Sequence, residues 1–141
     1  MDYFDYKTDS QLEPEFNPDS FDVEEFLKRS QEREQRRIEK QLEEVEQELE
    51  ERNQLHEELV SELEKKLDWY LERLKTLYQR PGSSESGDKN ELKSRIKEFY
   101  REIRDEKQSH WRDRQELEME KREICRELEE LSSENKIMEL L

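Results

Sequence analysis

The chain has 141 residues, of which 48% are charged and 29% hydrophobic, and its formal net charge at pH 7 is −15. Soluble globular domains have roughly 25% charged and 45–50% apolar residues, so this composition excludes a compact core of two packed layers. The negative charge disfavours nucleic acid and anionic membranes as partners, and no apolar run reaches the roughly 20 residues of a membrane span. A single cysteine, Cys125, excludes an intrachain disulfide and fits a reducing cytoplasm.

Residues 1–20 form an acidic tail in which aromatic side chains are scattered among Asp and Glu. Pro14 and Pro18 prevent a helix from running through this segment, and we expect it to be disordered. The alternative is a short docking peptide whose aromatic side chains fill a pocket on a partner. The first residues also lack the basic and apolar regions of a signal peptide.

Residues 21–80 contain neither glycine nor proline, which predicts one long helix over this whole range. An average helix has only about 11–12 residues, so such a helix belongs to a rod rather than to a globular domain. Its start is expected at Asp19, Ser20 or Asp22. Asp22 and Glu25 have the spacing of a capping box, with aspartate in place of Ser or Thr.

Apolar residues of this helix recur at steps of four and three, which predicts the seam of a coiled coil. The register passes through Arg52 and His56, so two consecutive core positions are polar, and the equal steps from Leu59 to Leu63 to Leu67 form a stutter. We assign the dimer or partner interface to Ile38, Leu42, Val45, Leu49, Leu59, Leu63, Leu67, Trp69, Tyr70, Leu74 and Leu77.

Residues 81–90 are the only interior segment with helix breakers and are predicted to be a flexible linker, after which a second long helix covers residues 91–141. Such a linker is long enough to reverse the chain into an αα-hairpin. The residues expected to make the fold-back contacts are Leu92, Ile96, Phe99 and Ile103. The alternative is a single extended rod with a flexible break.

No residue pattern predicts catalysis, a metal site or a cofactor. His56 and His110 lack a cysteine or a second histidine at ligand spacing, and Cys125 lacks a histidine partner. We therefore expect the chain not to be an enzyme. His56 is interpreted as a tolerated polar core position. In a parallel, in-register dimer two His56 side chains would face each other, so dimer stability would drop below roughly pH 6.

The dipeptide Trp69-Tyr70 is either core packing or a hot spot for a partner. With its surroundings, Glu64-Lys65-Lys66-Leu67-Asp68-Trp69-Tyr70 followed by Leu74, Leu77 and Arg80, it resembles the N-terminal coiled-coil region of the adenomatous polyposis coli (APC) proteins. The resemblance covers about residues 55–141. It implies a homodimerising segment of a cytoplasmic, cytoskeleton-associated scaffold in Wnt/β-catenin signalling and microtubule organisation, with Trp69 and Tyr70 in the dimer core. The chain has none of the armadillo repeats, β-catenin-binding repeats or basic microtubule-binding region of that family.

The sequence thus predicts an all-α, elongated coiled coil: a long helix, a second long helix folded back on it, and a parallel homodimer along residues 35–78. The expected function is self-association within a cytoplasmic scaffold. The expected partners are the chain itself and other coiled-coil or scaffold proteins, but not nucleic acid or a membrane. The alternative is a heterotypic adaptor of a kinetochore, centrosome or vesicle-tethering complex, in which Arg52 and His56 select the partner.

Overall fold

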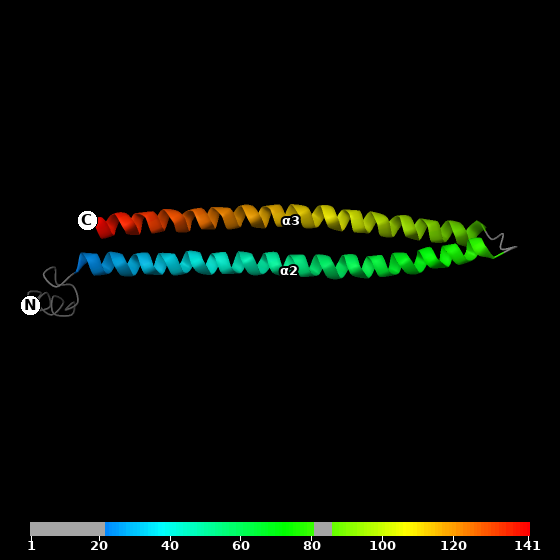
Figure 1. Ribbon diagram of the computed structural model, residues 1–141, viewed down its shortest axis with the longest axis horizontal. Helices are drawn as coiled ribbons and strands as arrows, with labels where there is room; N and C mark the ends of the chain where they lie inside the picture. Colours follow the sequence, from blue (N-terminus) through cyan, green and yellow to red (C-terminus); the bar gives the residue numbers. More distant parts are fainter. Residues whose placement is uncertain (1–21, 81–85) are drawn as a thin grey trace, which may run out of the picture.

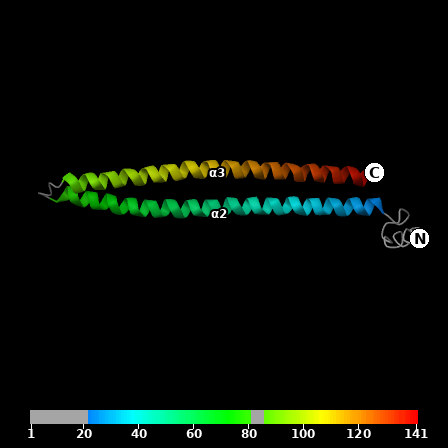
Figure 2. The ribbon, with the colours of Figure 1, turned by 180° about the vertical axis from the view of Figure 1, so that it is seen from behind.

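A computed structural model describes residues 22–80 and 86–141; the predicted tail and the first half of the predicted linker lie outside these ranges. The described residues form two helices, α2 (Val23–Gln79) and α3 (Ser86–Leu140), of 57 and 55 residues. The helices run antiparallel and side by side as one long hairpin (Figure 1), as the view from behind also shows (Figure 2). The predicted fold-back is confirmed, and the extended rod is wrong.

The two ends of α2 follow local rules of the sequence. Asp22 is the N-cap, and its side chain accepts hydrogen bonds from the backbone N–H groups of Glu24 at 3.0 Å and Glu25 at 3.3 Å. These two acidic residues also suit the positive end of the helix dipole. At the other end, Arg80 has an extended backbone, with φ −79° and ψ 117°, because a proline follows it. Of the three starts that the sequence predicts, the structure has Asp22, and the helix ends at Gln79, one residue before the predicted end.

α3 begins at Ser86, earlier than the predicted start at Glu91. Gly87 lies in the first turn, where a glycine costs roughly 1 kcal/mol relative to alanine. The opposing stabilisation comes from Tyr78 at the end of α2. The Lys89 and Lys93 ammonium groups lie 4.8 and 5.6 Å from the centre of the Tyr78 ring. These contacts hold the first turns of α3 against α2.

Two apolar clusters hold the helices together along the seam. The cluster near the free ends, here called the open-end cluster, has three buried residues and four half-buried ones: Ile38, Val45 and Ile124, with Leu42, Leu49, Leu128 and Leu131. The cluster near the chain reversal, here called the turn cluster, also has three buried residues and four half-buried ones: Leu67, Ile96 and Ile103, with Leu63, Tyr70, Leu74 and Phe99. Each cluster draws residues from both helices, so the seam is closed within one chain.

The break in the heptad spacing lies earlier in α2 than the sequence predicted. Val60 is half-buried, whereas Leu59 is 36% exposed. From His56 a step of four reaches Val60, and steps of three and four then reach Leu63 and Leu67. The stutter therefore precedes Val60 instead of lying between Leu59 and Leu67, because only this register leads into the turn cluster at the usual spacing.

Candidate interaction surfaces

A half-buried polar layer crosses the hairpin between the two apolar clusters. Arg52 of α2 donates from Nε to Asp113 and from Nη1 to Glu106 of α3, both at 2.8 Å. His56 donates from Nδ1 to the same Glu106 oxygen at 3.2 Å. The Arg52 and Glu106 side chains are only 15% and 16% exposed, so this charge pair is largely removed from water. The polar layer comprises Arg52, Asn53, His56, Glu106, His110 and Asp113.

The two histidines of the chain meet in this layer. The rings of His56 and His110 are stacked, with centroids 3.8 Å apart and planes inclined by 9°. His110 donates from Nε2 to the Asn53 Oδ1 atom at 2.7 Å. Burial lowers the pKa of His110 below its ordinary value, and the nearby His56 and Arg52 lower it further. Protonation of His110 therefore destabilises the folded hairpin.

The charge pair of the layer is held in its ionised form. Burial would raise the pKa of Glu106, but hydrogen bonds from Arg52 and His56 outweigh it and keep the pKa below its ordinary value. Hydrogen bonds to Asp113 and Glu106 raise the pKa of Arg52. A planar guanidinium shared by two carboxylates from the facing helix is a directional contact, so the layer favours one register of α2 against α3.

Within residues 22–80 and 86–141, no group of three or more His, Cys, Asp or Glu residues is arranged to hold a metal ion. Cys125 is half-buried on α3, and the surface around it is lined by charged residues without a histidine. Neither described helix is long and apolar enough to cross a membrane.

The structure places most of the predicted interface residues in the seam of the single chain. Among them, the buried ones are Ile38, Val45 and Leu67, and the half-buried ones are Leu42, Leu49, Leu63, Tyr70, Leu74 and Leu77. The predicted fold-back residues lie on the facing side: Leu92, Ile96 and Ile103 are buried and Phe99 is half-buried. A partner therefore meets the remaining, exposed residues first.

Trp69 and Tyr70 separate into a surface residue and a core residue. The Tyr70 ring packs against Phe99, with centroids 5.3 Å apart, inside the turn cluster. Trp69 is 53% exposed, lies edge-on to Tyr70 at 4.9 Å and has the Arg73 guanidinium 5.2 Å from its ring centre. Core packing thus applies to Tyr70, and only Trp69 is available to a partner.

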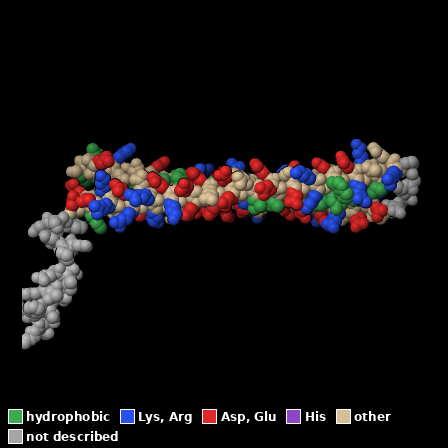
Figure 3. Space-filling view, turned by 90° about the horizontal axis from the view of Figure 1, so that it is seen from below, with side chains coloured by type: hydrophobic (Ala, Val, Ile, Leu, Met, Phe, Trp, Pro, Cys, Tyr) green, Lys and Arg blue, Asp and Glu red, His purple; other side chains and the backbone are tan. Residues whose placement is uncertain are grey.

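Four further aromatic side chains outside the seam are also more than half exposed: Phe26 at 55%, Tyr78 at 54%, Tyr100 at 56% and Trp111 at 64%. On the face of the rod that Figure 3 shows, charged side chains are spread along the whole length and apolar side chains gather in small patches. Tyr100 and Trp111 each follow a seam position, Phe99 and His110, by one residue. The sequence shows this offset, but it cannot be interpreted until the seam of α3 is known.

A family model matches the chain over residues 1–141, its full length. The chain belongs to this family, which is described as a family of unknown function, DUF8104. No curated protein and no solved structure matches the chain. The family match does not test the resemblance to the APC proteins, which stays a prediction.

Proposed function

We propose that this chain is a non-enzymatic self-association module whose hairpin is a coiled coil that dimerises through surfaces outside the seam. The observation that carries the proposal is the exposure of Trp69, Tyr78, Tyr100 and Trp111, each more than half accessible to water. Aromatic residues of this kind dominate the binding energy of protein interfaces. On a rod whose apolar seam is already closed, these four side chains are part of the apolar area left for a partner.

The exposed aromatic side chains supply part of the apolar area that a dimer buries. Trp and Tyr side chains bury roughly 150–250 Å² each, so a half-exposed one has about 100 Å² left to bury. At about 25 cal/mol per Å², four of them contribute about 10 kcal/mol. Association costs roughly 4–15 kcal/mol in lost translational and rotational freedom, which is comparable to this sum. Apolar burial alone therefore does not select a surface, and charge pairing must decide which surfaces meet.

The parallel dimer predicted along residues 35–78 would use the seam that α3 covers here, so it requires α3 to leave. Lateral pairing of closed hairpins keeps Ile38 and Val45 buried at 3% and 4% exposure. It also keeps the half-buried charges of the polar layer paired, whereas opening would leave them without partners. We therefore propose pairing of closed hairpins.

The second candidate is a heterotypic adaptor, such as a kinetochore, centrosome or vesicle-tether subunit. The observation that favours it is Trp111, 64% exposed and bordered by Arg104, Lys107 and Arg112, a surface that suits an acidic helix of any origin. A place in the cytoplasm, in Wnt/β-catenin signalling or in microtubule organisation rests on the resemblance to APC proteins alone.

Sedimentation equilibrium of the purified chain over a range of concentrations tests self-association. We expect a dimer, and we expect the variant Trp69→Ser/Tyr100→Ser/Trp111→Ser to be monomeric with unchanged helicity. Phe26→Ser is the matched control, because Phe26 is 55% exposed but lies in the first turns of α2, away from these aromatics. A wild-type chain that stays monomeric at every concentration would contradict the proposal and favour the adaptor.

A further inference from the structure

One row of residues on α3, outside the seam, contains only basic and aromatic side chains. Its residues follow one another at steps of four and three, the spacing that puts side chains on one side of a helix. All are exposed, Tyr100 to 56% and Trp111 to 64%. This basic–aromatic stripe consists of Lys93, Lys97, Tyr100, Arg104, Lys107 and Trp111.

Most cations of the stripe have no anionic partner in the described part of the chain. Lys97, Arg104 and Lys107 form no ion pair within residues 22–80 and 86–141. By contrast, Arg114 further along α3 pairs with Glu118 at 2.9 Å. Three side chains of the stripe, Arg104, Lys107 and Trp111, line one continuous surface. The stripe therefore presents unpaired positive charge beside an exposed indole ring.

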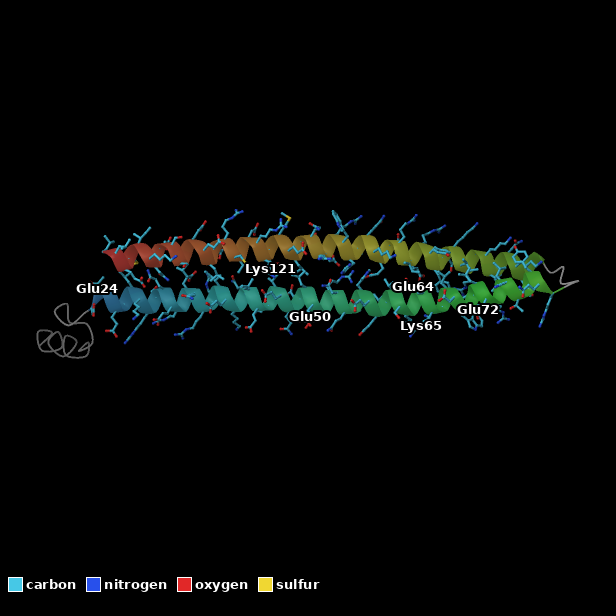
Figure 4. All side chains as sticks on the ribbon, in the orientation of Figure 1. Glu24, Glu50, Glu64, Lys65, Glu72 and Lys121 are labelled. Atoms are coloured by element: carbon cyan, nitrogen blue, oxygen red, sulfur yellow. The ribbon has the colours of Figure 1, made fainter. Side chains whose placement is uncertain are left out.

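α2 carries a complementary stripe at the same spacing. This acidic stripe, Glu39, Glu43, Glu46 and Glu50, also follows steps of four and three, and all its residues are exposed. Glu50 lies on the outside of the hairpin in Figure 4, whereas Lys121 of α3 extends toward α2, where it meets Glu46 at 3.5 Å. Between residues 39 and 64 the only basic residues are Lys40 and Arg52. This part of α2 is therefore strongly negative.

The two stripes cannot meet within one chain. The pairing of Arg52 with Asp113 and of Tyr70 with Phe99 fixes which parts of the helices are neighbours. In this register the basic–aromatic stripe lies alongside the part of α2 that follows Arg52, whereas the acidic stripe precedes Arg52. The positive and negative stripes therefore lie in different halves of the rod.

We propose that the basic–aromatic stripe of one copy binds the acidic stripe of a second copy. The inference rests on the proposed self-association and names the surfaces that make it. Equal spacing lets carboxylates and cations alternate in register, while Tyr100 and Trp111 lose their exposure to water. Because the stripes occupy different halves, the second copy is displaced along the rod or turned end for end. An in-register parallel pair of hairpins keeps the stripes apart.

A charge-reversal exchange tests this pairing. The stripe variant is Lys97→Glu/Arg104→Glu/Lys107→Glu, and the acidic variant is Glu39→Lys/Glu43→Lys/Glu50→Lys. All six positions are exposed, so circular dichroism should show unchanged helicity. Each variant alone should lose about tenfold or more in dimer affinity, because like charges then face each other. An equimolar mixture should recover association, because each variant supplies the charge that the other has lost.

Lys65→Glu/Lys75→Glu/Lys136→Glu is the matched control, since it makes the same change in net charge at exposed positions outside the stripe. Its dimer dissociation constant should lie within about twofold of that of wild type. This comparison is made in added salt, which screens the general effect of net charge. A mixture of the two reversal variants that stays monomeric would overturn pairing with a second copy and indicate another acidic occupant, such as a partner helix. If wild type dimerises and neither reversal weakens it, this inference fails while self-association stands. A monomeric wild type overturns both.

Discussion

Replacing Arg52 by methionine removes the central charge of the polar layer while keeping a side chain of similar length. Glu106 then stays at 16% exposure with only His56 as a hydrogen-bond donor, whereas Asp113, 46% exposed, can be hydrated again. Breaking a fully buried pair costs about 3–5 kcal/mol. Because one of the two carboxylates can return to water, we expect a loss of about 2–3 kcal/mol in the free energy of unfolding.

A second substitution makes this reasoning specific. Glu106→Gln alone should destabilise by about 1 kcal/mol, because Arg52 keeps its bond to Asp113 and the amide oxygen still accepts from His56. In the Arg52→Met background the same change should instead stabilise by about 1 kcal/mol or more, since it removes an unpaired charge that is only 16% exposed. The sign of the effect of Glu106→Gln therefore depends on whether Arg52 is present.

Urea unfolding followed by far-ultraviolet circular dichroism measures all four proteins of this cycle. Arg29→Met is the control: it breaks an exposed ion pair with Glu25, 67% and 56% exposed, that is worth at most about 1 kcal/mol. The reasoning is refuted if Arg52→Met unfolds at the urea midpoint of wild type. It is also refuted if Glu106→Gln destabilises equally in both backgrounds.

Two further perturbations test the same hairpin. Because burial lowers the pKa of His110, the free energy of unfolding should be highest above about pH 6.5, the ordinary pKa of histidine, and should fall below that pH. The pKa of Glu106 is also lowered, so the free energy of unfolding should fall a second time below about pH 4.5. Melting temperatures in buffers of different pH measure both losses. His110→Gln, whose amide still donates to Asn53, should abolish the loss below about pH 6.5; if that loss persists, another group causes it. Leu67→Ala should cost about 2–4 kcal/mol in urea titrations because Leu67 is 6% exposed, whereas Leu71→Ala, at 36% exposed, should cost about 1 kcal/mol; equal losses would mean that the seam is misassigned.

The helices and their reversal are predictable from the sequence because the signals are local. Asp22 and the proline after Arg80 bound α2, and the four-three spacing of residues such as Ile38 and Leu67 marks its buried side. The same spacing does not say which helix covers that side. A copy of the chain and the chain's own α3 satisfy an apolar stripe equally well, since both bring leucine and isoleucine at heptad steps.

The other half of the polar layer was not predictable without the register. The heptad spacing marks Arg52 and His56 as polar core positions. It does not connect them with Glu106, His110 and Asp113, which lie in a part of α3 with few apolar residues. Their meeting depends on where the chain turns back. Folding the sequence at the centre of the predicted linker places Arg52 and His56 within about two helical turns of Asp113 and His110, so the fold-back point relates the two halves of the layer.

Both described ends of the hairpin, Val23 and Leu140, lie at the same end of the rod, away from the chain reversal (Figure 1). A tensile load applied through these ends peels the helices apart one turn at a time instead of shearing the whole seam at once. The open-end cluster yields first, the polar layer next and the turn cluster last. The force that resists such a load should therefore be highest at the polar layer, near the middle of the rod, where three hydrogen bonds to carboxylates break together.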